Sequence, residues 1–206
     1  MTITINGNGT ITGISVGGLP NGIVDTDMLA DNAVTAAKTP LNTITHYDCW
    51  RLTANTVDED EDPLGSTTTI ERAIDGNGDR PGFGTFGNPM THSGGVFTFP
   101  ATGYWKVEFI AAIQGSDPNQ VSDSKIAVTT DGGSTWEPLS RGMGSIHDQG
   151  GNDVHNTNYC SLVVDVTNTS NVKVKFMFYN EEGSTTITGN ENYNRTCMMF
   201  TRIGDT

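Results

Sequence analysis

The chain has 206 residues and a formal net charge of −13, with 24 acidic and 11 basic side chains. Because the basic residues never cluster, this charge argues against binding to nucleic acid and against electrostatic attachment to anionic lipid. No apolar run approaches the roughly 18 residues that a transmembrane helix needs, and the opening MTITINGNGT lacks the basic and apolar regions of a secretory signal.

Residues 1–43 are predicted to form an appendage to one domain, which we call the head and place at residues 44–206. They contain no Trp, Tyr or Phe and are rich in Gly, Thr and Ile. A helix of two or three turns is expected between Asp25, a candidate N-cap, and Pro40. Such a helix is marginal alone, so the segment needs a partner surface; a disordered tail is the alternative.

From Thr45 onward the sequence predicts an all-β fold. Its 25 glycines and its many Thr and Asn residues favour strands joined by turns. Strands are expected within residues 45–57, 104–113, 124–130, 159–166, 171–180 and 194–203, and the long polar segment 141–158 is expected to be a loop. TNTS between the fourth and fifth of these strands indicates a hairpin. Several short antiparallel strands with turn signals imply a sandwich.

Several strands have one fully apolar face and a second face that is apolar only in part. In the strand that includes Trp105, Val107 and Phe109, the opposite face is polar at first and becomes apolar at Ile110. A sandwich buries one face of each sheet, so the second apolar face predicts an interface with neighbouring copies around an axis. The residues predicted for this interface are Ile110, Ala112, Met177, Tyr179, Met198 and Phe200.

The cysteines are three in number, Cys49, Cys160 and Cys197. A disulfide framework would require an even set, and no Cys/His spacing typical of zinc sites occurs. Cys160 and Cys197 lie in apolar strand-like runs, so we expect buried reduced thiols that act as small hydrophobic side chains.

The segment GVFTFPATGYWKVEFIAAI resembles the signature strand pair of the tumour necrosis factor and complement-globular-head superfamily. The matching residues are Gly95, Phe97, Pro100, Gly103, Tyr104 and Phe109. The resemblance covers roughly residues 45–206, and the closing TITGNENYNRTCMMFTRI is also similar to the superfamily's last strand. It implies a jelly roll that assembles as a homotrimer, with the strand after Gly103 lining the trimer axis. The polar 141–158 insertion and a weak first strand depart from the pattern.

The segment NGTITGISVGGLPNGIVDTDMLADNAVTAAK resembles stem segments of bacteriophage tail fibres, particularly those of marine phages. By that resemblance, residues 1–43 attach the head to the virus particle, without indicating which part of the particle. The residues predicted to form this virion anchor are Ile14, Val16, Leu19, Ile23, Val24, Met28 and Leu29.

Two groups of residues are candidates for metal binding. Asp75, Asn77 and Asp79 have the spacing that opens an EF-hand loop, but Arg80 replaces its glycine and Phe86 its final glutamate, which excludes an EF-hand. A solvated acidic loop is the favoured interpretation, and Ca²⁺ is the alternative. The second group is the His147 and His155 pair in one Gly- and Asn-rich loop, which could share a metal with nearby carboxylates.

We favour a solvent-facing recognition surface for that second loop, and no cofactor is expected. The residues predicted for this receptor-binding loop are His147, Asp148, Asn152, Asp153 and His155.

The chain lacks GxSxG, P-loop and HExxH motifs, so a non-enzymatic role is expected. The two resemblances together predict a short trimeric phage fibre or spike, assembled in the host cytoplasm, whose head contacts a host-surface glycan or protein. The alternatives are a capsid decoration or head-fibre protein that stabilises the shell, and a secreted complement-like ligand or adhesin. A capsular depolymerase is a third alternative, which would need a carboxylate cleft.

Overall fold

The computed structural model describes residues 4–5, 11–12, 44–55, 60–64, 70–73, 85–181 and 185–206. The chain divides into two compact units, Met1–Thr43 and Ile44–Thr206. In the first unit, β1 (Thr4–Ile5) pairs antiparallel with β2 (Ile11–Thr12). The predicted anchor residues Ile14, Val16, Leu19, Ile23, Val24, Met28 and Leu29, and the helix expected after Asp25, lie outside the described residues.

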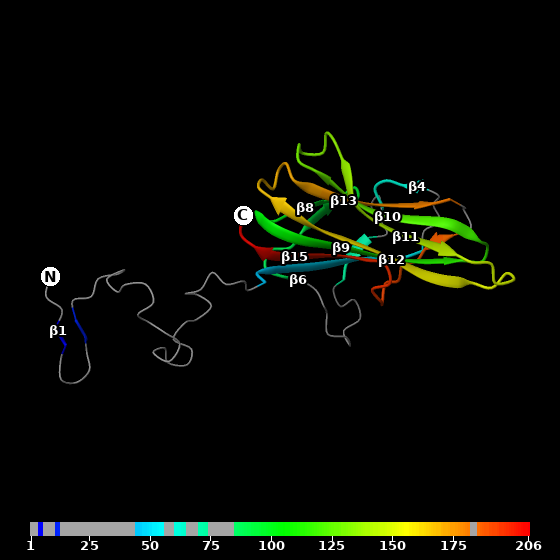
Figure 1. Ribbon diagram of the computed structural model, residues 1–206, viewed down its shortest axis with the longest axis horizontal. Helices are drawn as coiled ribbons and strands as arrows, with labels where there is room; N and C mark the ends of the chain where they lie inside the picture. The colour runs from blue at the N-terminus through cyan, green and yellow to red at the C-terminus, as the bar shows by residue number, and fades with distance from the viewer. Residues whose placement is uncertain are drawn as a thin grey trace. The chain divides into compact units, whose positions relative to one another are not determined.

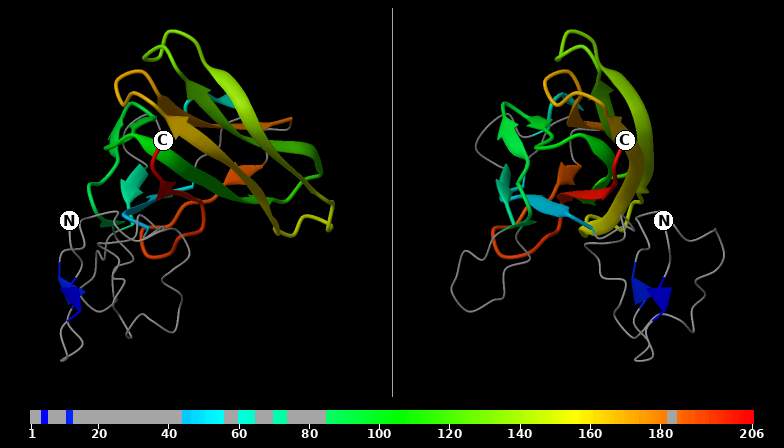
Figure 2. Two further views of the ribbon diagram at one scale, coloured as in Figure 1. Left: turned by 60° about the vertical axis from the view of Figure 1, so that its left-hand side comes forward. Right: turned by 90° about the vertical axis from the view of Figure 1, so that its left-hand side faces the viewer.

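The head consists of two antiparallel sheets, and its described residues include no helix. The seven-stranded sheet has the order β12 (Val154–Val166), β9 (Gly103–Gly115), β15 (Cys197–Gly204), β3 (His46–Leu52) and β5 (Ile70–Arg72), with β14 (Thr186–Ile187) on β9 and β6 (Thr85–Phe86) on β3. The six-stranded sheet has the order β11 (Glu137–Ile146), β10 (Asn119–Thr129), β13 (Lys173–Asn180), β8 (Val96–Thr98) and β7 (Thr91–Ser93), with β4 (Asp60–Glu61) on β13. Figures 1 and 2 show the two sheets facing each other.

The chain crosses repeatedly from one sheet to the other, which makes the fold a jelly roll. The predicted hairpin across TNTS was therefore wrong, since β12 pairs with β9 whereas β13 pairs with β10 and β8. Both strands present apolar residues to the same core from opposite sheets. Local patterning is the same for a hairpin and for such a crossing, so the sequence could not separate them.

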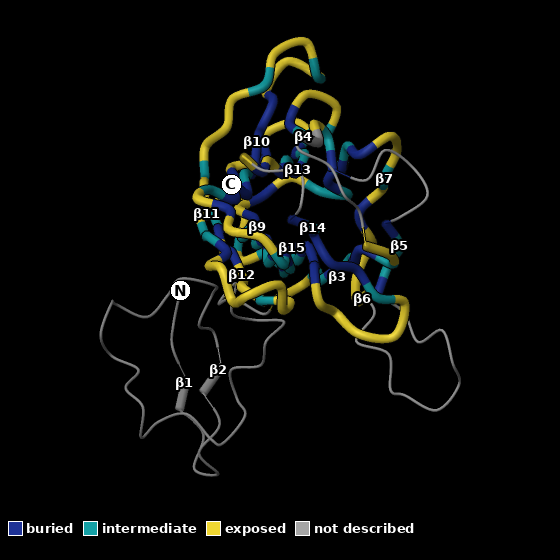
Figure 3. The backbone as a smooth tube through the Cα atoms, turned by 90° about the vertical axis from the view of Figure 1, so that its right-hand side faces the viewer, coloured by how far each residue is buried: buried dark blue, intermediate teal, exposed yellow. Residues whose placement is uncertain are grey.

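Aromatic side chains from both sheets meet in the core. The ring centroids of Phe97 and Phe176 are 5.5 Å apart, and that of Phe200 lies 5.1 Å from Phe97 and 5.9 Å from Phe176. Phe109 approaches Phe176 to 5.1 Å. All four side chains are buried, and Figure 3 shows the buried segments gathered inside the head. The predicted all-β sandwich is confirmed.

The polar segment 141–158 is mostly strand rather than loop. β11 continues to Ile146 and β12 begins at Val154, so only residues 147–153 connect them. Ladder hydrogen bonds do not depend on apolar side chains, and the inward-facing Asn158 donates to the Ser122 carbonyl at 3.1 Å. Strands are recognised in a sequence by alternating apolar residues. At this end of the sandwich the strands carry polar side chains instead, so the expectation of a loop was wrong.

Glycine is required where β9 begins. Gly103 has φ of +131°, and a Cβ there would lie 2.4 Å from the Gly204 carbonyl oxygen of β15. This close approach lets β9 enter the sheet directly beside the end of β15.

Among the described residues, none forms a helix that is long and apolar enough to cross a membrane.

Candidate functional site: the outer face of the seven-stranded sheet

The side of the seven-stranded sheet that points away from the core is organised in cross-strand rows. Ile110 of β9 lies opposite Tyr159 of β12 and Cys197 of β15. One row along, Glu108 lies opposite Met199, which in turn lies opposite Cys49 of β3. Because cross-strand partners share a face, these residues all point outward, and we call this surface the outer face.

An apolar cluster occupies the centre of the outer face. Its members come from β3, β9, β15 and the residue after β5, and we call it the outer cluster. Cys49, Ala73 and Cys197 are buried, and Tyr47, Ile110 and Met199 are partly buried against them. A sheet that needed only one buried face would carry polar side chains at these positions.

Exposed apolar side chains surround the outer cluster. Tyr159 is 51% exposed and Val163 is 56% exposed on β12, beside Tyr104, which is 41% exposed on β9. Phe86 is 49% exposed and stacks on Tyr47, with centroids 6.3 Å apart. Contiguous surfaces of this kind typically mark interfaces in soluble proteins.

Two charged groups near the centre of the outer face, Lys106 and Glu108, are paired with each other. Glu108 Oε1 accepts from Tyr159 Oη at 2.7 Å and from Lys106 Nζ at 2.8 Å. Burial opposes ionisation of Glu108, but the hydrogen bonds from Lys106 and Tyr159 outweigh it and lower the pKa of this carboxyl. The face thus carries an apolar centre beside a neutralised ion pair, which can be covered at less cost than isolated charges.

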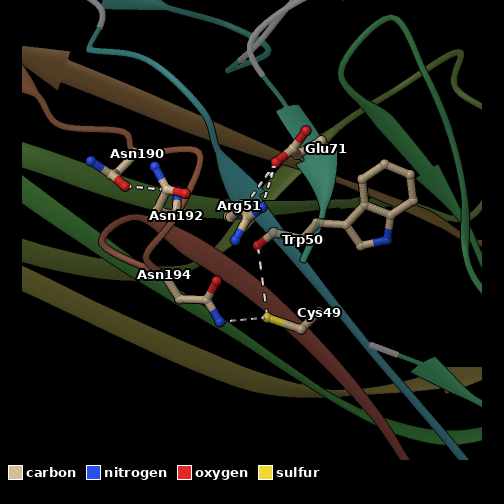
Figure 4. A network of polar contacts seen from close by, with 7 residues as sticks. All are labelled: Cys49, Trp50, Arg51, Glu71, Asn190, Asn192 and Asn194. Atoms are coloured by element: carbon tan, nitrogen blue, oxygen red, sulfur yellow. Dashed lines mark hydrogen bonds and ion pairs between the residues drawn. The ribbon is translucent and has the colours of Figure 1, made fainter. Parts of the chain in front are cut away.

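The Cys49 thiol of the outer cluster is contacted by the loop that carries Asn194 (Figure 4). The Asn194 amide donates to Cys49 Sγ at 3.7 Å, and Cys49 Sγ lies 4.0 Å from the Trp50 carbonyl oxygen. Beside them, Arg51 donates to Glu71 Oε1 from Nε at 2.9 Å and from Nη2 at 2.7 Å. A hydrogen bond to Cys49, together with burial, raises the pKa of the Cys197 thiol. All three cysteines are free and buried, as the sequence predicted.

Four of the six residues predicted for the interface do not lie on the outer face. Met198 and Phe200 are fully buried in the sandwich core, because the register of β15 turns Cys197 and Met199 outward instead. Both faces of this strand are apolar, so composition could not fix its orientation. Met177 and Tyr179 belong to β13 of the other sheet. Only Ile110 and Ala112 lie on the outer face.

Of the residues predicted for the receptor-binding loop, those from His147 to Asp153 lie in the exposed connection after β11, whereas His155 lies in β12. Asp148 Oδ1 accepts from the Gly150 amide at 2.8 Å, and the Asn152 side chain donates to the Gln149 carbonyl at 2.8 Å. Asp153 Oδ2 accepts from Gln114 of β9 at 2.7 Å. The loop is therefore ordered by its own hydrogen bonds and by one contact with the sheet.

Among the predicted metal ligands, only His147 and His155 lie in the described residues, and they are not part of a metal-binding group there. His147 and His155 are exposed, and within the described ranges no group of three His, Cys, Asp or Glu side chains could hold a metal ion. Asp75, Asn77 and Asp79 lie outside the described residues. A receptor-binding role for His147, Asp148, Asn152, Asp153 and His155 stays a prediction.

One buried carboxylate that the sequence did not single out has a structural position. Asp48 is 2% exposed and accepts hydrogen bonds from Trp50 Nε1 at 3.0 Å, Arg72 Nε at 2.9 Å and the Met90 amide at 2.9 Å. Its oxygens are satisfied by protein donors, so it connects β3 to β5 and to the segment before β7. Nothing in this arrangement leaves the carboxylate available to a substrate.

No protein-family model and no curated protein sequence matches the chain. Among solved structures, the TNF protein Eiger from S. frugiperda has a TM-score of 0.53 at 10% identity, covering 78% of this chain and 93% of its own. Murine APRIL has a TM-score of 0.47 at 12% identity, covering 76% of this chain and 99% of its own. At these identities the likeness concerns the fold, and the head has a TNF-like jelly-roll fold.

Proposed function

We propose that the protein is a non-enzymatic structural protein of a bacteriophage particle, a short homotrimeric fibre or spike. Residues 1–43 attach it to the particle, and the jelly-roll head points outward and binds a molecule of the host surface. The particle is assembled in the host cytoplasm. The outer cluster is the observation that carries the assembly part of this proposal.

A trimer explains why a sheet buries one face in the core and carries a second apolar cluster on the other. Around a three-fold axis, the outer faces of three copies would cover Ile110, Tyr159 and Val163. Removing apolar surface from water stabilises such an assembly by roughly 25 cal/mol per Å². The TNF and complement-head resemblance of the sequence supports the same stoichiometry.

The attachment part of the proposal rests on the sequence of residues 1–43, which resembles the stems of phage fibres. The segment contains no aromatic residue and lacks the large side chains on which an independent core depends. We therefore assign its apolar residues to contacts with the particle rather than to a second folded head.

The test has two readouts that can fail separately. Light scattering coupled to size exclusion should give about three times the protomer mass of 22.0 kDa; a mass near that of one protomer would contradict the trimer. Immunogold labelling of intact particles should show the protein on the tail. A chain that lacks residues 1–43 should form a soluble trimer that no longer enters particles, and normal incorporation would contradict the anchor.

The same labelling separates the alternatives. Signal over the capsid would favour a decoration or head-fibre protein that uses the same trimer. A protein that is absent from particles and recovered from the medium would favour a secreted ligand, the alternative that the similarity to the TNF protein Eiger keeps open.

A further inference from the structure

A groove lies on the outer side of the six-stranded sheet, away from the outer cluster. Its volume is about 360 Å³, at the lower end of the range for small-molecule sites. The β7–β8 hairpin forms its floor, where Thr91 pairs with Thr98 and Ser93 pairs with Val96. Lys173 of β13 lies opposite Thr98 and closes one side.

The β10–β11 turn forms the opposite wall, and Asp131 fixes its shape. Asp131 Oδ1 accepts from the amides of Ser134 and Thr135, each at 2.9 Å, and from Thr129 Oγ1 at 2.7 Å. The Thr135 hydroxyl also donates to this carboxylate. Its hydrogen bond contributes most, and together the hydrogen bonds lower the pKa of the Asp131 carboxyl. The Asp131 carboxylate therefore points toward the donors within its own turn. The same turn contributes Gly132 and Gly133 to the groove.

Trp136 supplies the aromatic surface of this wall. Its indole nitrogen donates to the Gly133 carbonyl at 3.2 Å, so the ring lines the groove as an apolar surface rather than as a donor. Lys175 Nζ lies 5.0 Å from the ring centroid and 2.5 Å from Asp62 Oδ1. This pair of contacts holds the indole on the side of β13.

The polar groups of the groove are available for a ligand. The hydroxyls of Thr91, Ser93 and Thr98 have no hydrogen-bond partner in the part of the chain that the structure describes. Lys173 Nζ donates to the Gly132 carbonyl at 3.2 Å and forms no ion pair with any described carboxylate. The lining includes no acidic residue, although the chain carries a net charge of −13.

We propose that this groove binds an acidic saccharide unit, with the sugar ring against Trp136, its hydroxyls on Thr91, Ser93 and Thr98, and its carboxylate on Lys173. An aromatic face beside several neutral hydroxyls suits the alternating apolar and hydroxylated surfaces of a pyranose. The Lys173 ammonium group, which has no carboxylate partner in the lining, selects for a negative charge. This proposal deepens the proposed recognition role of the head and rests on it.

The experiment uses full-length protein labelled with 5-fluorotryptophan, which gives three ¹⁹F signals from Trp50, Trp105 and Trp136. Methyl β-D-glucuronide should shift the Trp136 signal with a Kd on the order of 1 mM, as its small size allows. Trp105 is fully buried and serves as an internal control. Methyl β-D-glucoside, which lacks the carboxylate, should bind about 10-fold more weakly.

Variants assign the contacts. Lys173→Gln should remove the preference for the charged sugar, and Thr98→Val should weaken both sugars, with the melting temperature confirming a folded head. Tyr179→Leu alters an exposed aromatic on the same strand outside the groove and should leave binding unchanged. The proposal would be overturned if the Trp136 signal does not move at glucuronide concentrations up to about 50-fold the expected Kd. It would also be overturned if the preference for the charged sugar survives Lys173→Gln.

Two further outcomes distinguish this site from the proposed assembly. N-acetylglutamate that binds as tightly as the glucuronide would show a general carboxylate site and would overturn the saccharide assignment. A trimer on phage particles that does not bind the glucuronide would contradict the saccharide site alone. A monomer that binds the glucuronide would contradict the trimeric assembly alone.

Discussion

The outer surfaces of the two sheets differ in what they leave for a partner. On the seven-stranded sheet, Cys49, Cys197 and Ile110 form an apolar cluster, and the nearby ion pair of Lys106 and Glu108 is internally neutralised. On the six-stranded sheet, the strands carry lysines and hydroxyls, and a turn folds beside them to leave a groove. The first surface is suited to a second protein copy and the second to a small polar ligand. In our proposals, one jelly roll therefore separates assembly from recognition by placing them on opposite sheets.

The largest expected effect tests which side of β15 faces the core. Phe200→Asp would bury an unpaired carboxylate among Phe97, Phe99 and Phe176, at a cost of at least about 4 kcal/mol. Because domains of this kind are stable by about 5–15 kcal/mol, we expect a largely unfolded or insoluble protein. Urea denaturation followed by tryptophan fluorescence measures the change.

The matched control is Met177→Asp on β13. Met177 is only partly buried on the outer side of its sheet and lies opposite Lys125, so the change should stay within about 0.5 kcal/mol. If Phe200→Asp were as stable as Met177→Asp, the assigned orientation of β15 would be wrong.

The next effect separates the two outer surfaces by their role in assembly. Ile110→Asp should cost the isolated protomer only about 1 kcal/mol, but three desolvated carboxylates near one axis should cost several kcal/mol per trimer. We expect a folded monomer, with mass measured by light scattering. Met177→Asp should remain trimeric, and an Ile110→Asp protein that stays a stable trimer would contradict an interface on the seven-stranded sheet.

Alternation in the sequence was sufficient for the strand from Trp105 onward, because its core face is continuously apolar while Lys106 and Glu108 mark the other face. It was insufficient for β15, where Cys197, Met198, Met199 and Phe200 are apolar on both faces and only the pairing with β9 decides which side is inward. A one-residue change of register exchanges the two faces of a strand. A second apolar face was therefore predicted in kind but mostly from the wrong residues, and its role as an interface stays a prediction.

The groove escaped prediction for a different reason. Its residues come from β7, β8, β13 and a turn, so Ser93 and Trp136 are far apart in the sequence and neither belongs to a recognisable motif. The sequence Asp131-Gly132-Gly133 is typical of a turn, so the turn itself is encoded locally. The pairing that places this turn beside the hairpin is a property of the sheet order, which local patterns do not encode.

A moderate effect is expected from pH through His92, which lies beneath the groove floor. Its Nε2 accepts from the Gly95 amide at 3.1 Å, its ring packs on Phe97 at 4.6 Å and on Trp50 at 5.4 Å, and burial lowers its pKa from 6.5. The unfolded chain therefore binds a proton more readily than the folded one. The contribution of His92 is complete above pH 6.5 and is lost as the pH falls through 6.5 toward the lower folded pKa.

Melting curves measure this contribution. Between pH 7.5 and 5 we expect the melting temperature to fall by roughly 2–5 °C, and His92→Gln should flatten part of that fall. His46 remains as a second contributor, because burial and, to a lesser extent, Arg202 lower its pKa as well. If the melting temperature of the His92→Gln protein falls with pH as much as that of the unchanged protein, protonation of His92 does not contribute to the fall.

The smallest effect concerns how the outer cluster is covered within a single protomer. Cys49 is 1% exposed and Asn194 lies over its sulfur, whereas burial raises the pKa of Cys160 in the core to about 11. A disulfide reagent requires an accessible thiolate, so all three thiols should react slowly in the native protein and rapidly in urea. Asn194→Ala should speed labelling of Cys49 several-fold and leave Cys160 unchanged, because only Cys49 loses its cover.

If Cys49 in the Ile110→Asp monomer is labelled as fast as in the unfolded chain, the trimer rather than the loop protects the cluster. Slow labelling in that monomer would instead place the protection in the loop that carries Asn194.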